Sequence, residues 1–168
     1  MINRGKQFED VIKKAFLKVE NVSIDRLHDQ TTGYANSANI CDFIVYQEPY
    51  EYYFECKSVH GNTLPFHNIS DTQLSGMLEK SKIQGVRAGI ICWWVDKDVT
   101  AFIPIALIDA LKELNKKSVS YTYIQDYCND NHELIVERFK PIIIKGKKKK
   151  VFFEYNMESF LDELRLIK

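Results

Sequence analysis

The chain is 168 residues long; 45% of its residues are apolar and 12% are aromatic. This length fits a single domain spanning residues 1–168. About 70% of the surface of such a chain is buried on folding, so neither disulfides nor a structural metal is needed. The apolar content excludes a disordered chain. Lys and Arg together number 23, as do Asp and Glu, and this zero balance argues against a uniformly basic surface while allowing local basic patches.

Several features of the sequence favour a cytoplasmic protein. The first residues are charged throughout and lack the apolar segment of a signal peptide. No apolar run approaches the roughly 18 residues that span a bilayer, so we expect no membrane partner. The four cysteines form no C-x-x-C pair and stand among apolar or aromatic neighbours. We therefore interpret them as reduced thiols in the core.

The first part of the chain predicts a helix followed by a β-hairpin. The helix begins after Asn3, its expected N-cap, because apolar residues recur at helical spacing as far as Val19. The polar segment Gln30–Asn39 is typical of a loop. Two runs of β-branched and aromatic residues, Ile40–Gln47 and Glu51–Val59, then predict the hairpin.

The rest of the chain alternates between helices and strands, without a linker or a repeat. His60–Ile69 is typical of a loop, and a helix begins at Ser70 and continues to about Gln84, where Gly85 ends it. The elements expected after it are strands Ala88–Val95 and Thr100–Pro104, a helix Ile105–Lys116, a strand Ser118–Tyr127, a hairpin of Glu133–Lys145 with Val151–Tyr155, and a helix Met157–Ile167. Together they predict one mixed α/β domain.

Three charged residues on the first hairpin form a D-x12-E-x-K pattern: Asp42, Glu55 and Lys57. Glu55 and Lys57 are two residues apart on a strand, so their side chains project from the same face. A turn with an even number of residues places Asp42 directly opposite Glu55, with Cβ atoms about 4.5–5.5 Å apart. A turn with an odd number of residues would separate them.

Two carboxylates at that distance repel each other, and a divalent cation would relieve the repulsion by taking both as ligands. This trio suits phosphodiester hydrolysis. Asp42 and Glu55 would hold the metal, which polarises the phosphate and lowers the pKa of a bound water, and Lys57 would orient that water or stabilise the transition state. The alternative is an ordinary solvated hairpin face, on which Glu and Lys often alternate.

The ordered set of motifs resembles the RecU-type Holliday-junction resolvases of the PD-(D/E)xK nuclease superfamily. The residues that carry the resemblance are Asn3-Arg4-Gly5, Glu9, Asp42, Tyr53–Ser58, Leu64–Ile69, Gln73 and the apolar strand after Gly89. The resemblance implies a restriction-endonuclease-like mixed central sheet flanked by helices. It also implies a homodimer that cuts branched DNA symmetrically with Mg²⁺, for which Mn²⁺ would substitute.

The resemblance implies a catalytic set of Asp42, Glu55, Lys57 and Gln73, with Glu9 as a further acid near the metal. Two of these residues have simpler interpretations. Glu9 lies four residues before Lys13, a common surface pair on a helix. Gln73 lies three residues after Ser70, the spacing of a capping box, and that role competes with catalysis for one amide group.

One segment departs from the family pattern. Ile24–Ile40 is short and contains no proline, whereas the family carries a basic segment and a long stalk before its catalytic aspartate. A compact, phage-type relative with a reduced stalk is therefore expected, with altered selectivity for four-way junctions.

Basic residues predict where DNA phosphates bind. The first group lies at the start of the first helix, and the second within Lys140–Lys150, which holds six lysines and no acid. A third group lies at the end of the second helix and just after it. The predicted DNA-binding residues are Arg4, Lys6, Lys80, Lys147, Lys148, Lys149 and Lys150, with Lys82 and Arg87 as further candidates. Solvated helix ends and a solvated loop are the alternatives.

The remaining histidines and tryptophans carry no clear functional signal. The four histidines show no ligand spacing, and Trp93 and Trp94 are expected in the core or at a dimer interface. The leading hypothesis is a metal-dependent endonuclease that resolves Holliday junctions. The alternatives are another nuclease of the superfamily, such as a restriction-type enzyme, and a nucleic-acid-binding protein of the same fold without catalysis.

Overall fold

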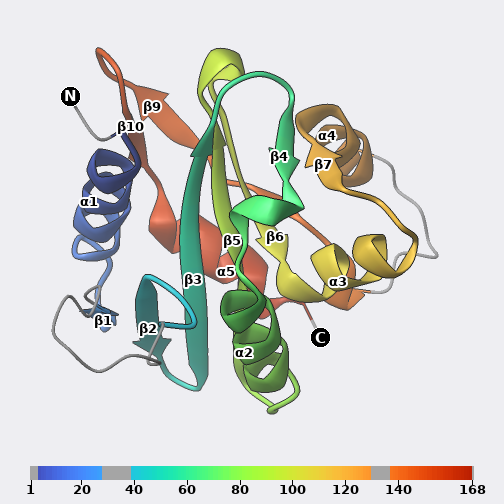
Figure 1. Cartoon of the computed structure of the whole chain (residues 1–168). Helices are drawn as coiled ribbons and strands as arrows, with labels where there is room; N and C mark the ends of the chain where they lie inside the picture. The colour runs from blue at the N-terminus through green and yellow to red at the C-terminus, as the bar shows by residue number, and fades with distance from the viewer. Residues whose placement is uncertain (1–3, 28–38, 130–136, 168) are drawn as a thin grey trace, which may run out of the picture.

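The computed structural model describes residues 4–27, 39–129 and 137–167 of the chain (Figure 1). The expected cap Asn3, most of the expected loop Gln30–Asn39 and the start of the expected arm Glu133–Lys145 lie outside these ranges. The helices are α1 (Arg4–Phe16), α2 (Asp71–Ser81), α3 (Ile105–Glu113), α4 (Tyr121–Asn129) and α5 (Met157–Arg165). The strands are β1 (Ser23–Arg26), β2 (Phe43–Gln47), β3 (Tyr50–Val59), β4 (Thr63–Pro65), β5 (Val86–Trp94), β6 (Val99–Pro104), β7 (Ser118–Ser120), β8 (Ile142–Ile143), β9 (Gly146–Lys148) and β10 (Phe153–Tyr155).

A mixed sheet forms the centre of the fold, as the sequence predicts. Its order within the described residues is β1-β2-β3-β5-β6-β8. β3 and β5 run parallel and are joined through α2, whereas the other neighbours pair antiparallel. Two small sheets, β4 with β7 and β9 with β10, lie outside it. β3 and β5 are therefore covered on both sides by neighbouring strands and carry the longest ladder.

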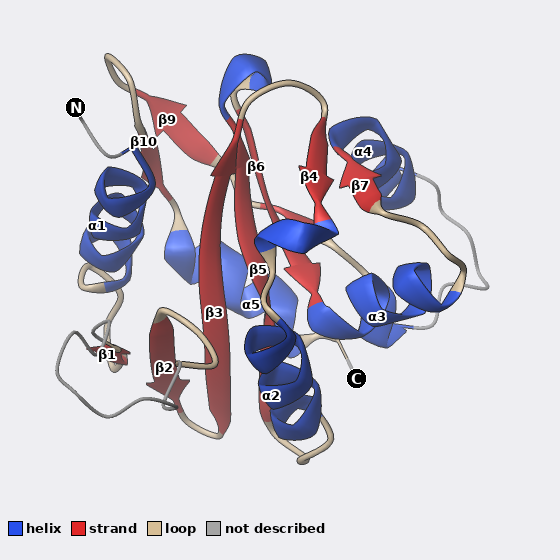
Figure 2. Ribbon diagram, viewed as in Figure 1, coloured by secondary structure: helices blue, strands red, loops and turns tan. Residues whose placement is uncertain are grey.

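Helices cover both faces of the sheet (Figures 1 and 2). One core contains α1 and α5, whose Phe16 and Phe160 pack with Phe54 of β3. The other core contains α2, α3 and α4. Side chains of β3 alternate between the two, so that Phe54 enters the first core and Tyr53 the second. Trp93 and Trp94 are buried in the same alternating way, which confirms their placement in the core.

The first hairpin has the register predicted from its sequence. Gln47 pairs with Tyr50 and Phe43 with Phe54, so the turn holds only Glu48 and Pro49. A two-residue turn fixes the parity of the pairing, and with it the face on which each side chain lies. The extension of this register brings Asp42 opposite Glu55.

The prediction of a strand over Ser118–Tyr127 is wrong beyond its first residues. Only Ser118–Ser120 is a strand, and α4 follows directly. The Ser120 hydroxyl accepts a 3.1 Å hydrogen bond from the Tyr123 backbone N–H, as an N-cap does. Ile124 is buried and the rings of Tyr123 and Tyr127 lie 6.0 Å apart, as side chains four positions apart on a helix do. Their helical spacing outweighs the strand preference of the aromatic residues.

The late hairpin is shorter than predicted. Its arms are β9 and β10, with Lys148 paired to Phe153, whereas Ile142–Ile143 pairs with β6 in the central sheet. Two further strands had no clear sequence signal: β1, and β4 within the expected loop His60–Ile69. The helix predicted to reach Gln84 ends at Ser81, and Gly85 adopts a positive φ of 83° in the turn before β5.

The described residues contain no helix of sufficient length and apolarity to cross a membrane. All four cysteines are unpaired thiols, and Cys41, Cys56 and Cys92 are buried. The prediction of reduced core cysteines is therefore confirmed for these three, whereas Cys128 is half-buried.

Candidate active site

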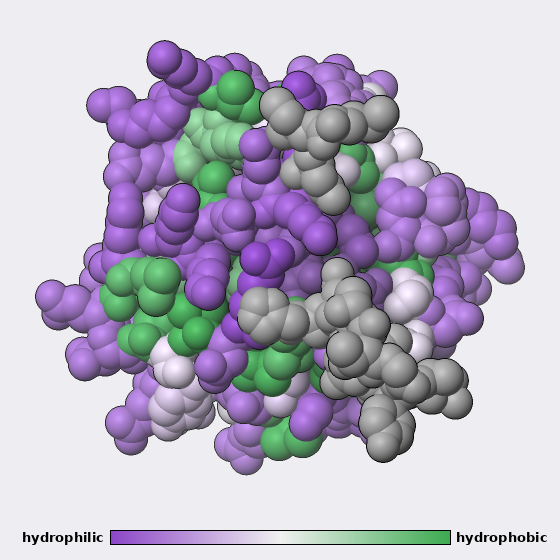
Figure 3. All heavy atoms as spheres, turned by 60° about the vertical axis from the view of Figure 1, so that its left-hand side comes forward, coloured by the Kyte–Doolittle hydropathy of each residue, from purple (hydrophilic) through white to green (hydrophobic). Residues whose placement is uncertain are grey.

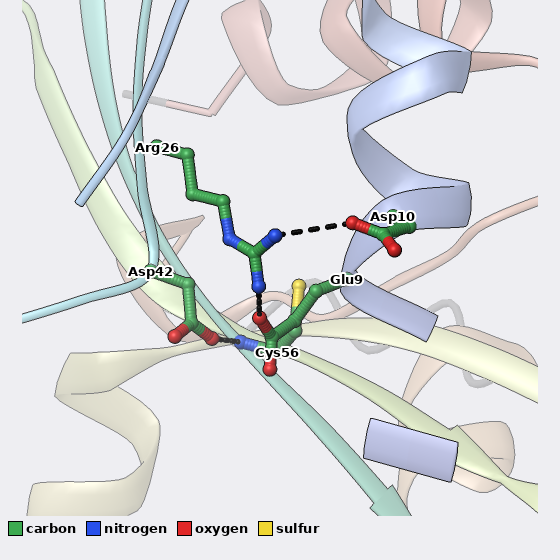
Figure 4. A network of polar contacts seen from close by, with 5 residues as sticks. All are labelled: Glu9, Asp10, Arg26, Asp42 and Cys56. Carbon is green, nitrogen blue, oxygen red and sulfur yellow. Dashed lines mark hydrogen bonds and ion pairs between the residues drawn. The ribbon is translucent and has the colours of Figure 1, made fainter. Parts of the chain in front are cut away.

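Asp42 lies just before β2, at the point where that strand meets β1 and β3. Its backbone N–H donates to the Phe54 carbonyl over 3.1 Å, and its carbonyl accepts from Leu27 over 2.8 Å. Its carboxylate oxygen Oδ2 accepts a 2.7 Å hydrogen bond from the Cys56 backbone N–H (Figure 4). Backbone bonds to both neighbouring strands therefore fix this residue, and the bond from Cys56 fixes its side chain.

Glu55 is almost completely buried, with 4% of its surface exposed. Its Oε1 accepts a 2.7 Å hydrogen bond from Nζ of Lys57, which lies two residues along the same strand. Its other oxygen, Oε2, is buried and has no hydrogen-bond partner within the described structure. A buried acceptor without a partner is costly, so this oxygen marks a place for a ligand.

Asp42 and Glu55 strongly influence each other's ionisation. Burial, followed by the charge of Glu55, raises the pKa of Asp42 to about 7, although the hydrogen bond from Cys56 lowers it. Burial also raises the pKa of Glu55, against the opposing effects of Lys57 and Gln73. Both carboxyl groups therefore retain protons more strongly than fully exposed ones do, because neither charge is fully compensated.

These properties fit a divalent cation. Two adjacent carboxylates whose charges oppose each other, and a buried oxygen without a partner, provide the hard oxygen ligands that Mg²⁺ requires. The described residues contain no group of three or more His, Cys, Asp or Glu side chains arranged around a common point. A cation between Asp42 and Glu55 would therefore take its other ligands from water, substrate or backbone oxygens, as Mg²⁺ commonly does.

Gln73 performs the capping role that its spacing predicts. Its Oε1 accepts from the Ser70 backbone N–H over 3.0 Å, and its own N–H donates to the Ser70 hydroxyl over 3.2 Å. The Gln73 side chain also interacts with Glu55, because a hydrogen bond from it lowers the pKa of that carboxyl. One side chain therefore both caps α2 and lies close enough to Glu55 to affect its ionisation.

Glu9 forms an ion pair that the sequence did not reveal. The Arg26 guanidinium pairs with Glu9 and also with Asp10, the latter over 3.1 Å (Figure 4). Arg26 ends β1 and pairs in register with Phe43, so it lies beside the strand that begins just after Asp42. Burial, Asp42, Glu55 and then Glu9 raise the pKa of the Cys56 thiol, which places Glu9 within electrostatic reach of Cys56, the residue after Glu55.

The predicted basic residues occupy three places on the surface. Arg4 contacts His60, and Lys6 is exposed nearby on α1. Lys80 lies over the Tyr53 ring, 5.3 Å from its centre. In the late hairpin, Lys147 and Lys150 are exposed, whereas Lys148 pairs with Asp98 and Lys149 with Glu154.

The lysine-rich segment has no acid of its own, and the structure supplies acids from elsewhere. Glu154 receives both Lys149, over 3.1 Å, and Lys18, over 2.7 Å, and these bonds lower its pKa to about 2. Arg87, a further candidate, donates to the Ile167 carbonyl and lies over the Tyr50 ring. Its guanidinium therefore contributes to the packing of the C-terminal segment.

A mixed sheet covered by helices, with one buried and one half-buried carboxylate beside a lysine, is the arrangement of a nuclease of the resolvase fold. The structure is similar to that of Archaeoglobus fulgidus Hjc, a Holliday junction resolvase from an archaeal hyperthermophile, with a TM-score of 0.51 and 16% sequence identity over 71% of this chain and 90% of that chain. The family model for Recombination protein U matches residues 3–144. The chain therefore belongs to the RecU family of Holliday-junction resolvases. No curated protein sequence matches it.

The family match extends across α1, the carboxylate pair and α2, and ends within the loop after β8. The resemblance recognised from the sequence is thereby confirmed, as are the mixed sheet and the branched-DNA nuclease function that it implied. The hairpin of β9 and β10 and the helix α5 lie beyond the match.

Proposed function

We propose that the chain cuts four-way DNA junctions as a Mg²⁺-dependent endonuclease whose metal ligands are Asp42 and Glu55. Mn²⁺ would serve in place of Mg²⁺. The observation that supports this assignment best is the carboxylate pair, in which the buried Glu55 Oε2 has no hydrogen-bond partner among the described residues while Oε1 is held by Lys57. Membership of the RecU family supplies the substrate class.

A divalent cation bound by these carboxylates would polarise the scissile phosphate and lower the pKa of an attacking water, so that cleavage leaves 5′-phosphate and 3′-hydroxyl ends. The protein orients the two ligands. Cys56 holds Asp42 from the backbone, and Lys57 holds Glu55. Because Glu55 is nearly buried, its carboxylate has little freedom to leave this position.

The other predicted catalytic residues have supporting roles in this proposal. Lys57, whose side chain is 21% exposed, is placed to stabilise negative charge on the phosphate in the transition state with its ammonium group. Gln73 lowers the pKa of Glu55, against the effect of burial, and orients it from the start of α2. Glu9, which is anchored by Arg26, increases the negative potential near the cation.

The remaining features of the proposal concern assembly and location. Residues 1–168 act as one nuclease domain, and two copies form a homodimer, because symmetric cutting of a junction needs two active sites. Arg4, Lys6, Lys80 and Lys147–Lys150 contact phosphates of the branched DNA. The chain functions in the cytoplasm, where that DNA is present.

A cleavage assay tests the proposal. Labelled four-way junctions, flaps and linear duplexes are incubated with the protein in Mg²⁺ or in EDTA. We expect cutting of the junction in Mg²⁺ alone, and its loss in Asp42→Ala and Glu55→Ala, while junction binding persists. Asp126→Asn, which changes an exposed carboxylate on α4, is the matched control and should cut normally.

Three results would contradict the proposal. Absence of metal-dependent cutting of any substrate would reject an endonuclease with this metal site. Equal cutting of linear duplex and junction would reject junction selectivity. Loss of DNA binding in the Asp42 or Glu55 variants would show that these residues have a structural role instead.

A further inference from the structure

A cleft of about 810 Å³ lies between three segments that are distant in the sequence. The start of α1 contributes Arg4, the residue after β3 contributes His60, and the tip of the β9–β10 hairpin contributes Lys149, Lys150, Val151 and Phe152. The ribbon views place the start of α1 beside this hairpin, at the end of the molecule where β3 finishes (Figures 1 and 2). The cleft thus unites two basic groups that the sequence predicted separately.

The charge around this cleft is positive. Arg4, Lys149 and Lys150 line it, and none of its lining residues is an acid. Within the described residues, Glu154 pairs with Lys149 from outside the lining, and no acid pairs with Lys150. The surrounding face, which carries α1, is mainly hydrophilic with separate hydrophobic patches (Figure 3). Such a cleft suits a phosphate backbone better than an apolar ligand.

A chain of hydrogen bonds orients Arg4 at one wall of the cleft. The Gly61 backbone N–H donates to Asp96 over 2.6 Å, and the other oxygen of Asp96 lies 2.9 Å from His60 Nδ1. Asp96 thereby favours a proton on Nδ1, which leaves Nε2 to accept from Arg4 over 3.2 Å. One of the five donors of Arg4 is used in this way, and the others can reach a phosphate.

The opposite wall is the hairpin tip, which internal contacts hold in place. Lys148 pairs with Asp98 beside β6, and Phe152 packs on Trp93 of β5 with ring centres 5.3 Å apart. Val151, at the tip, is 50% exposed. The lysines therefore stand on a fixed support next to an apolar side chain that a deoxyribose can contact.

We propose that this cleft binds the sugar-phosphate backbone of one arm of the branched DNA, with Arg4, Lys149 and Lys150 as phosphate contacts and His60 as the positioning residue for Arg4. This inference rests on the proposed function, because the DNA must also reach Asp42 and Glu55. His60 lies five residues beyond Glu55 on β3, roughly 16 Å at strand spacing. Duplex DNA covers that distance in about five base pairs, so one arm can occupy both places.

The test measures junction binding in EDTA, which prevents cutting, at KCl concentrations between about 50 and 200 mM. The slope of log K against log salt is negative, and each lost phosphate contact reduces its magnitude by about 0.9. Arg4→Gln and Lys150→Gln should each show that decrease in slope magnitude, and their affinity should be reduced several-fold at the higher salt. In the double variant the slope magnitude should fall by about 1.8. Lys116→Gln, an exposed lysine after α3, is the matched control and should keep the wild-type slope.

A double-mutant cycle tests the role of His60. His60→Ala should weaken binding in the wild type but have no further effect in Arg4→Gln, because it acts through the guanidinium. His60→Gln retains an acceptor and should restore affinity. Additive effects of His60→Ala and Arg4→Gln would show that His60 does not position Arg4.

The binding assay separates this inference from the proposed nuclease activity. Unchanged affinity and slope in Arg4→Gln and Lys150→Gln would overturn the cleft assignment, even if the wild type cuts junctions in Mg²⁺. Shallower salt dependence of binding in these two variants, together with a wild type that cuts no junction, would support the cleft and reject the nuclease mechanism. A wild type that fails to bind junctions would reject the cleft as well.

Discussion

The backbone N–H of Cys56 donates a 2.7 Å hydrogen bond to Asp42 Oδ2, and this contact directs one carboxylate of the pair toward the other. Cys56 follows Glu55 on β3, so a single strand supplies one carboxylate of the pair and the backbone group that orients the other. The same contact favours the ionised form of Asp42, but burial and the charge of Glu55 outweigh it. The free protein thus tolerates an electrostatic strain that a cation would relieve.

Neutralising Asp42 should stabilise the metal-free protein while abolishing cleavage. The pKa of this group rises from 3.8 to about 7 on folding, so its contribution to stability is present at low pH and is lost as the pH rises through about 7. Asp42→Asn should therefore raise the free energy of unfolding in EDTA at pH 8 by roughly 1–4 kcal/mol. Urea denaturation at pH 8 and pH 5 measures this difference.

The gain should shrink at pH 5, where Asp42 of the wild type is protonated and uncharged. Asp126→Asn supplies the control, because that side chain is exposed on α4. A variant less stable than the wild type at pH 8 would show that the hydrogen bond from Cys56 outweighs the repulsion.

Divalent cations should bind more tightly as the pH rises. A proton on Asp42 competes with the cation, and its pKa is about 7. Below that pH, affinity should fall by about tenfold per unit for a single competing proton, so it should be roughly 30-fold weaker at pH 5.5 than at pH 8. Calorimetric titration with Mg²⁺ or Ca²⁺ measures it, and a pH-independent affinity would indicate that the cation does not displace this proton.

Substitutions at Ser70 and Gln73 should distinguish the contribution of the α2 cap to stability from the contribution of Gln73 to cleavage. Ser70→Ala removes the hydroxyl that accepts from the Gln73 N–H, so the protein should lose about 1 kcal/mol of stability and cut at nearly the wild-type rate. Gln73→Ala removes the reciprocal cap and the side chain that acts on Glu55. It should reduce both stability and the cleavage rate. Single-turnover cleavage rates and thermal unfolding distinguish the two variants. Equal cleavage rates in Ser70→Ala and Gln73→Ala would show that Gln73 serves only as part of the cap.

The sequence was sufficient to predict the carboxylate pair because a local feature sets it. The turn at Glu48 and Pro49 has an even length, and this parity alone brings Asp42 opposite Glu55. The ion pair of Arg26 with Glu9 depends instead on a strand of four residues whose place is fixed only by pairing with β2. A strand so short has too few residues for a clear alternating pattern.

The difference between local features and features set by tertiary packing also explains the wrong predictions in the last third of the chain. The aromatic residues after Ser118 favoured a strand, but Ser120 caps a helix whose buried residue, Ile124, packs in the second core. The cleft formed by Arg4, His60 and the late hairpin joins three segments that are far apart in the sequence. Only the folded sheet brings them together, so no motif could reveal it.

Gly89 allows the central strands to pack closely, and alanine at this position should destabilise the fold. A Cβ there would lie 2.3 Å from the Ile103 carbonyl oxygen and 2.6 Å from the Phe102 ring. Gly89 pairs with Pro104 on one side and with Phe54 on the other, so β5 cannot move away without disturbing both ladders. Overpacking of this kind costs about 1–3 kcal/mol, and more where the backbone is fixed.

Gly61→Ala provides the matched comparison. Gly61 has a φ of 78° in an exposed turn with no atom near its would-be Cβ, so alanine there should cost only the left-handed backbone conformation, about 1–2 kcal/mol. Chemical denaturation of both variants measures the difference. Because Ile90, the residue after Gly89, pairs with Glu55, a shift of β5 should also lower the cleavage rate of Gly89→Ala. Wild-type stability in Gly89→Ala would show that β5 and β6 can separate at this point without loss.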